Sequence, residues 1–296
     1  MPANSQNDIP ASPPLERVFQ INDMKLSAQC WGVGSSIPVL ALHGWMDNSA
    51  SFHQLAPLLA GCEVLAPDMA GHGYSDHRSR HGAYNIWDDI LDVLAIADQM
   101  EWDTFNILAH SRGAFVCLLL AAAMPERVNK VVMLDGILTV ASDTADSPKQ
   151  LGEYLRDQKQ RYNKPSRVYA ALADAVQTRA EKLGLNHSEC LPLVARAMAP
   201  LANESGWVWR HDPRVAGNSA FKLTEQHQQA FLAAFQSQAL LILAEDGFSK
   251  WPDIQERVAS NPCITLVEHA GGHHMHMQKV HCESLSQRIN ALFQAD

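Results

Sequence analysis

A short apolar run at residues 107–109 ends in a polar turn, and a helix-forming apolar run follows at once. Within this turn Ser111 has a small residue two positions before it, Ala109, and another two positions after it, Gly113. A serine at the tip of a sharp strand-to-helix turn needs a strained backbone, and only small neighbours let strand and helix approach so closely. The pattern therefore predicts a strand, a tight turn and a helix, with the Ser111 hydroxyl exposed at the turn.

Similar apolar runs recur along the chain at intervals that leave room for helices between them. Runs that are apolar throughout suit strands that are covered on both faces, as in a mostly parallel sheet. We expect strands at residues 18–22, 26–31, 39–42, 62–66, 105–109, 131–134, 240–243 and 264–267. The first two flank an Asn-Asp turn and predict an antiparallel hairpin. The chain is therefore expected to form an α/β fold with an eight-stranded, mostly parallel sheet and helices on both faces.

Two helices of this core can be placed from their spacing. Apolar residues recur at helical intervals over residues 86–97, after Asn85 as an N-cap and with Asp88 as its capping-box partner. The same periodicity over residues 285–293 predicts an amphipathic helix that closes the fold.

Residues 138–234 break the alternation, because they carry helical patterns but no convincing buried strand. We expect helices at residues 154–163, 166–183 and 189–199, and an ordered connection at 203–217. An insertion between the sixth and seventh strands lies over the carboxyl ends of the strands, where ligands bind in open α/β sheets. The predicted organisation is a disordered tail (1–14), an α/β core (15–137 and 235–296) and a helical lid, or cap, over the site (138–234).

Composition narrows the classes of partner. The 296 residues are 47% hydrophobic, enough for a large core, and the formal charge of −9 disfavours nucleic acid, which binds clustered Lys and Arg. No apolar stretch approaches the ~20 residues that span a bilayer. Six scattered cysteines, without a CxxC motif or a secretory signal, favour a reduced, cytoplasmic protein. The oligomeric state stays open.

The turn after the third predicted strand reads His43-Gly44-Trp45. The glycine permits close backbone approach, so the amide of Trp45 and the amide of Arg112 could both face a developing oxyanion. The Arg112 amide is also expected at a helix N-terminus, which favours negative charge. We expect His43, Gly44 and His110 to contact the substrate beside these donors.

A histidine-rich segment follows the eighth predicted strand. A serine hydroxyl becomes a good nucleophile only when a neighbouring imidazole takes its proton, and His273 follows two glycines that can turn its ring toward Ser111. His274 and His276 are expected to be lid contacts or surface residues, and His274 is a further candidate for substrate binding. A metal site is disfavoured, since neither a cysteine nor a convincing carboxylate set accompanies these histidines.

A carboxylate that orients the imidazole could come from either of two strand ends. Asp246 follows the seventh predicted strand, although it stands one residue early, and Asp135 follows the sixth. Both are expected at the carboxyl edge of the sheet, and the residues alone leave the choice open. Asp68 is interpreted as a turn-stabilising residue.

Together these motifs resemble the α/β-hydrolase superfamily over nearly the whole chain after the tail. Residues 43–52, 71–73, 210–214 and 272–277 are closest to the serine hydrolase-like proteins within it. The resemblance implies that Ser111 attacks a carbonyl and forms an acyl-enzyme that water releases, with His273 as base and no cofactor. In the common pattern the acid stands at the position of Gly247, so this sequence departs from it. Some relatives place the acid after the sixth strand, which favours Asp135.

A small-molecule acyl substrate, such as a carboxylic ester, is therefore expected. Reactions on this fold that use a carboxylate nucleophile are excluded by Ser111. Amide, thioester and carbon–carbon bond cleavage share the serine chemistry, and fold alone does not choose among them. A binding or signalling module without turnover is the alternative. The Arg112 guanidinium would either recognise an anionic substrate or pair with an acidic residue, and we favour the pairing.

Overall fold

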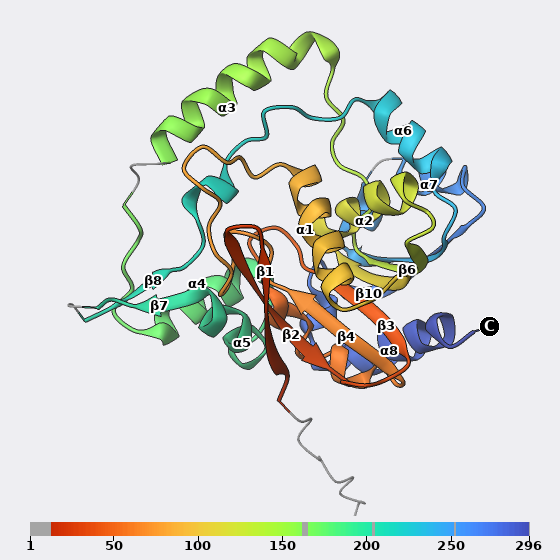
Figure 1. Ribbon diagram of the computed structural model, residues 1–296, viewed down its shortest axis with the longest axis horizontal. Helices are drawn as coiled ribbons and strands as arrows, with labels where there is room; N and C mark the ends of the chain where they lie inside the picture. Colours follow the sequence, from red (N-terminus) through yellow and green to blue (C-terminus); the bar gives the residue numbers. More distant parts are fainter. Residues whose placement is uncertain (1–12, 162–164, 203–204, 252, 296) are drawn as a thin grey trace, which may run out of the picture.

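A computed structural model describes residues 13–161, 165–202, 205–251 and 253–295. A central eight-stranded sheet has the strand order β1-β2-β4-β3-β5-β6-β9-β10 (Figure 1). Its members are β1 (Leu15–Ile21), β2 (Met24–Trp31), β3 (Ile37–Leu42), β4 (Cys62–Pro67), β5 (Phe105–His110), β6 (Val128–Leu134), β9 (Gln238–Asp246) and β10 (Ile264–Gly272). β2 pairs antiparallel with β1 and β4, and the other pairs are parallel. The predicted fold class is confirmed.

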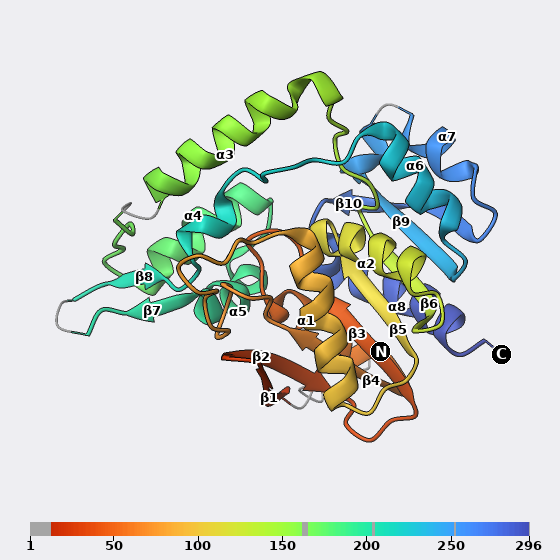
Figure 2. The same cartoon turned by 45° about the horizontal axis from the view of Figure 1, so that its top comes forward.

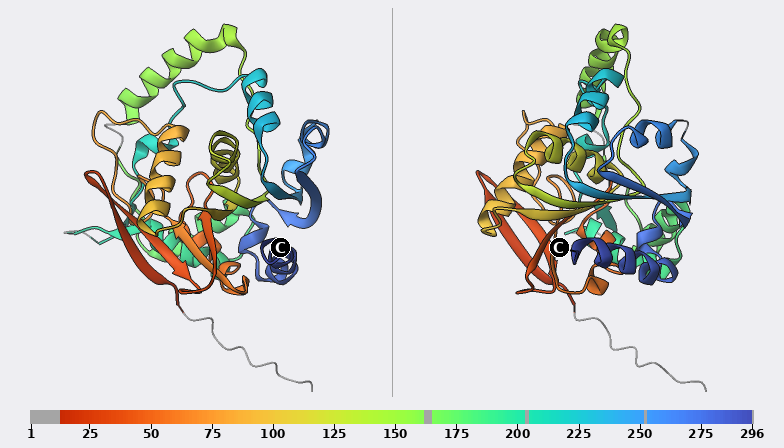
Figure 3. Two further views of the ribbon diagram at one scale, coloured as in Figure 1. Left: turned by 45° about the vertical axis from the view of Figure 1, so that its right-hand side comes forward. Right: turned by 90° about the vertical axis from the view of Figure 1, so that its right-hand side faces the viewer.

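Helices cover both faces of the sheet (Figure 3). One apolar core lies under α1 (Ile86–Gln99), α2 (Arg112–Ala123) and α7 (Ile254–Ala259), and α1 and α2 lie side by side (Figure 2). A second core lies under α8 (Lys279–Phe293) on the opposite face. Every residue of β5 is buried, since both of its faces meet helices.

The two predicted core helices are present. α1 begins after Asn85, whose amide donates to the Asp88 carboxylate at 3.3 Å, one half of the capping box that the sequence indicates. α8 buries Leu285, Ile289 and Phe293 against the sheet.

Besides two short 3-10 helices, the described part of the inserted segment between β6 and β9 contains α6 (Glu225–Ala234) at its end and five other elements before it. They are α3 (Ser147–Arg161), α4 (Leu172–Leu183), α5 (His187–Ala197), β7 (Met198–Pro200) and β8 (Trp207–Trp209). α3 arches above the rest of the molecule (Figure 1). Figures 1 and 2 place this segment on the side of the sheet where β5 ends and α2 begins.

Three details of this segment differ from the sequence prediction. β7 and β8 form an antiparallel hairpin where no strand was expected. The helix expected from residue 166 begins only at Leu172, because Tyr169 instead pairs with Trp207 beside the hairpin. α3 begins at Ser147, seven residues earlier than expected, and its predicted last residues lie outside the described range. Short, half-buried strands such as these carry a weak sequence signal.

The predicted tail lies almost entirely outside the described residues, and β1 begins at Leu15. All six cysteines are unpaired. None of the helices described here is long and apolar enough to cross a membrane.

Candidate active site

Ser111 stands between β5 and α2 in a strained conformation, with φ 52° and ψ −116°. Its neighbours must be small. A Cβ on Gly113 would lie 2.2 Å from the carbonyl oxygen of Leu42, and one on Gly136 would lie 2.8 Å from Ser111 Cα. The amide of Ser111 donates to the carbonyl of Leu134 at 3.0 Å, which fixes the turn against β6. The predicted strand–turn–helix is therefore present, with its strain held by packing on two sides.

His273 follows the end of β10 and faces the serine. Its Nε2 lies 2.9 Å from Ser111 Oγ, and its Nδ1 lies 2.6 Å from Asp135 Oδ2. Gly271, at φ 112°, supplies the turn that aims the ring. The side chain of His273 is one-third exposed (33%), so the ring is reachable from solvent.

Asp135 comes directly after β6 and is fully buried. Its Oδ1 accepts hydrogen bonds from the amides of Ala244 at 2.8 Å and Phe248 at 3.0 Å, which leaves Oδ2 for His273. The carboxylate is thus held by backbone groups of β9 and the loop after it. A carboxylate, an imidazole and a hydroxyl are joined in series, the arrangement that serine hydrolases use.

Gly247 makes room for this carboxylate. A Cβ at Gly247 would lie 2.2 Å from Asp135 Oδ2. The space that a side chain at position 247 would need is therefore filled by the Asp135 carboxylate from the neighbouring strand.

Asp246, the alternative acid, is not brought to the imidazole. Its side chain is exposed and forms an ion pair with Lys250 at 2.7 Å, and this hydrogen bond and charge lower the pKa of Asp246. Successive residues of a strand point to opposite faces, so a residue one position before Gly247 points away from Asp135 and His273. Of the two candidate acids, Asp135 is therefore the one that contacts His273, and Asp246 is not.

The two amides expected to face an oxyanion lie at the ends of β3 and β5. The amide of Arg112 is the first of α2, so it has no partner within its helix. Among the described residues, neither this amide nor that of Trp45 donates to another protein group. Two unpaired donors beside a serine suit a developing negative charge.

The side chains of these two residues are engaged elsewhere. The Arg112 guanidinium forms an ion pair with Asp89 of α1, so the pairing favoured from the sequence is present. The indole of Trp45 donates to the carbonyl of Val215 at 2.8 Å, which joins this turn to the inserted segment.

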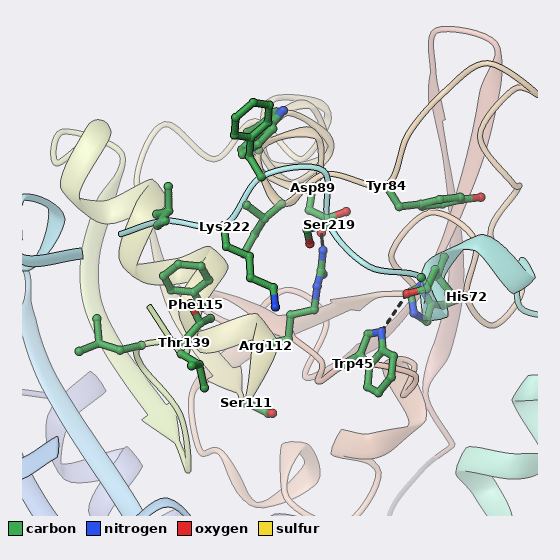
Figure 4. Close-up of a pocket in the computed structure, with 18 of the residues that line it drawn as sticks. Trp45, His72, Tyr84, Asp89, Ser111, Arg112, Phe115, Thr139, Ser219 and Lys222 are labelled. Carbon is green, nitrogen blue, oxygen red and sulfur yellow. Dashed lines mark hydrogen bonds and ion pairs between the residues drawn. The ribbon is translucent and has the colours of Figure 1, made fainter. Parts of the chain in front are cut away.

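A cavity of about 430 Å³ opens in front of Ser111 (Figure 4). Core and inserted segment both line it, and most of its lining side chains are aromatic or aliphatic. They include Trp45, Tyr84, Trp87, Phe115, Leu138, Val140, Val215, Phe221, Phe248 and Trp251. Such a cavity suits a ligand with an apolar part.

Four residues expected to contact the substrate lie outside the lining of this cavity: His43, Gly44, His110 and His274. The amide of Met69 donates to His43 Nε2 at 3.0 Å, and burial lowers the pKa of His43. Gly44 lets the His110 ring approach, since a Cβ there would lie 2.7 Å from His110 Nδ1. The prediction is corrected: these groups are buried behind Ser111, where they support the turns.

Asp47, His110, His274 and Arg179 form a second group, which we call the Asp47 cluster. Asp47 Oδ2 lies 3.3 Å from His274 Nε2 and 3.6 Å from His110 Nδ1, while Asp47 Oδ1 lies 3.0 Å from the Arg179 guanidinium. Burial lowers the pKa of His110 to about 4. Burial alone would raise the pKa of Asp47, but charge and hydrogen bonds from His274 and His110 hold that pKa well below its usual value.

Within the described residues, the Asp47 cluster brings together ligand atoms that lie close enough to share a metal ion, with all of them within 4.8 Å of one another. Sequence reasoning missed the carboxylate because Asp47 is far in the sequence from both histidines, and more than 200 residues from His274. Arg179 already balances the charge of Asp47, so the cluster needs no metal ion to be neutral. The absence of a metal site stays a prediction.

Asp68 has the structural role expected of it. Its buried carboxylate accepts from the amides of Ser49 at 2.9 Å and Tyr74 at 2.8 Å. It also pairs with Arg196 of α5 at 2.8 Å, which anchors the inserted segment to the core.

Comparisons with known proteins agree with this geometry. The α/β-hydrolase fold family matches residues 37–280. A serine hydrolase-like protein of Dictyostelium discoideum is 30% identical over 272 residues, which cover 86% of this chain and 74% of that protein. One from Danio rerio is 29% identical over 265 residues, with 86% and 81% covered.

A solved structure gives the same result. The crystal structure of a hypothetical protein from Pseudomonas aeruginosa PAO1 has a TM-score of 0.91 and 35% identity, over 95% of this chain and 99% of that one. The chain therefore belongs to the α/β-hydrolase superfamily, in the group of serine hydrolase-like proteins.

Proposed function

We propose that this protein is a serine hydrolase that cleaves a carboxylic ester, or a related acyl compound, through an acyl-enzyme. The observation that carries the proposal is the continuous contact from the Asp135 carboxylate through His273 to the Ser111 hydroxyl, at the wall of an apolar cavity. In the proposed organisation, residues 15–137 and 235–296 form the catalytic core, and residues 138–234 form a lid that shapes the acyl site.

In the first half of the reaction, Ser111 Oγ attacks the acyl carbon while His273 Nε2 takes the hydroxyl proton. Asp135 holds the imidazole in the tautomer that accepts this proton and stabilises the imidazolium that forms. The tetrahedral oxyanion is bound by the amides of Trp45 and Arg112. Each such donor typically contributes about 3 to 4 kcal/mol of transition-state stabilisation.

The intermediate then collapses, the bond to the leaving oxygen breaks, and the imidazolium returns its proton to that oxygen. In the second half, His273 takes a proton from water, which attacks the acyl-enzyme. Ser111 leaves with that proton and the acid is released. The cycle as proposed draws on side chains, backbone amides and water.

The test is hydrolysis of p-nitrophenyl butyrate and labelling by a fluorophosphonate probe. Ser111→Ala should lose labelling and lower kcat by about 1,000-fold or more, because no other group supplies the attacking oxygen. Ser260→Ala, which changes an exposed serine that follows α7, is the control and should keep both signals. Equal labelling of wild type and Ser111→Ala would overturn the nucleophile. Wild-type protein that binds acyl ligands without turning over any ester would instead be a binding member of the fold.

A further inference from the structure

The charges of the side chains that line the cavity do not sum to zero. Three such side chains are Asp89, Arg112 and Lys222. Asp89 is almost fully buried and pairs with Arg112, so these two charges neutralise each other. No ion pair joins Lys222 to any residue in the part of the chain that the structure describes. The lining therefore carries one unbalanced positive charge.

This charge is directed at the reacting serine. Lys222 comes from the inserted segment just before α6, and its side chain points into the cavity toward Ser111 and Arg112 (Figure 4). The hydroxyl-bearing residues Thr139 and Ser219 line the same cavity and add polar groups to it. Lys222 itself is exposed, so its ammonium group stands at the mouth of the cavity, while the remaining walls are mainly aromatic and aliphatic.

The overall charge of the protein makes this local cation informative. At −9 the chain as a whole repels anions, so attraction must come from a local group. A neutral apolar acyl chain would leave the ammonium group without a partner beside it. An acyl substrate that carries its own carboxylate would pair with it.

We infer that Lys222 binds a carboxylate of the substrate, so that the preferred substrates are esters that bear an anionic group. The inference rests on the proposed hydrolase function and names its substrate class. Lys222 is a specificity residue here and takes no part in bond making. Arg112 remains occupied by Asp89, and its amide keeps its separate role.

The test compares esters that differ only in charge. Mono-p-nitrophenyl adipate carries a carboxylate on the acyl side, and p-nitrophenyl hexanoate is its neutral counterpart. A second pair, 4-(hexanoyloxy)benzoate and phenyl hexanoate, carries the charge on the leaving side. We expect wild type to have at least about a tenfold higher kcat/KM for the anionic member of one pair, in line with a hydrogen bond to a charged group. The pair that shows the preference identifies which side of the substrate Lys222 faces.

Variants assign the preference to Lys222. Lys222→Met should remove it while changing kcat/KM for the neutral ester by less than about twofold, and Lys222→Arg should keep most of it. Lys182→Met removes a positive charge from α4 away from this cavity, and it should leave the preference intact. A wild type without any preference, or equal losses on charged and neutral esters in Lys222→Met, would overturn the inference.

Failure of the hydrolase proposal can be separated from failure of this inference. If wild type hydrolyses none of the four esters, binding of adipate monoanilide, a stable amide, is measured by calorimetry. Binding that is weakened about tenfold or more in Lys222→Met would retain the recognition site without the reaction. Binding that does not depend on Lys222 would overturn both.

Discussion

The same two chain segments, around Ser111 and around His273, contribute histidines to two different pairings with aspartate, and the two pairings differ in burial and in charge. His110 directly precedes Ser111, and His274 directly follows His273. His110 and His274 nevertheless face Asp47, while His273 faces Asp135. The imidazole of His273 is one-third exposed and reaches a hydroxyl. The imidazoles of the Asp47 cluster are almost completely buried.

The counter-charge separates the two pairings further. Arg179 neutralises Asp47, whereas Asp135 is held by two backbone amides and, among the described residues, pairs with His273 and with no Arg or Lys. The negative charge of Asp135 is thus free to stabilise an imidazolium. The comparison teaches that solvent access and counter-charge, rather than the presence of Asp beside His, distinguish a site suited to proton transfer from a buried support.

The largest expected effect is at Asp135. Asp135→Asn should lower kcat for a p-nitrophenyl ester by about 1,000-fold to 10,000-fold, because the imidazole loses its orienting charge and its correct tautomer. Asp246→Asn should change kcat by less than about twofold, since that carboxylate is exposed and pairs with Lys250. Equal, mild losses in the two variants would break the distinction, and circular dichroism would check that both proteins fold.

The next effect is on stability. Asp47→Asn should destabilise the protein by about 3 to 5 kcal/mol, because it leaves the largely buried Arg179 without its partner. Urea unfolding measures the change. The double variant Asp47→Asn/Arg179→Met should recover part of the loss, since it removes both charges. No recovery would mean that the ion pair is not what Asp47 contributes.

The smallest effect is the dependence of stability on pH. Burial lowers the pKa values of His43, His72, His110 and His276, to about 4 for His110. These groups stay neutral in the folded protein below pH 6.5, where the unfolded chain takes up protons. Their contribution to stability is therefore present above pH 6.5 and declines as the pH falls toward 4, by up to ~1.4 kcal/mol per pH unit for each histidine.

His110→Gln isolates one of these groups. Between pH 6.5 and 4.5 the slope of the unfolding free energy should fall by about 1 kcal/mol per pH unit relative to wild type. His227→Gln, at an exposed position on α6, is the control and should leave the slope unchanged. An unchanged slope in His110→Gln would show that His110 is not held neutral by burial.

Much of the fold could be predicted from local sequence patterns, and the errors of that prediction also have local causes. Six of the eight sheet strands were found as short, mainly apolar runs, and the first two were found as a hairpin about an Asn-Asp turn. The β7–β8 hairpin was missed because each strand has only three residues, which show no alternation and, apart from Met198, are not fully buried. The four residues expected to touch substrate lie beside Trp45, Ser111 or His273 in the sequence, and nearness in sequence does not indicate the side of the turn to which a side chain points.

The sequence by itself determined the nucleophile turn, the position of His273 after its glycines and the location of the two unpaired amides. These features depend on backbone conformations that few residue types adopt, so they leave a mark within a few positions. Only the tertiary structure decided which aspartate contacts His273 and that Asp47 completes a buried cluster. It also decided that Asp89 neutralises the charge of Arg112, while the charge of Lys222 is not neutralised by an ion pair among the described residues. These pairings join segments 23 to more than 200 residues apart, and their geometry depends on strand register and on burial, which no short stretch of sequence specifies.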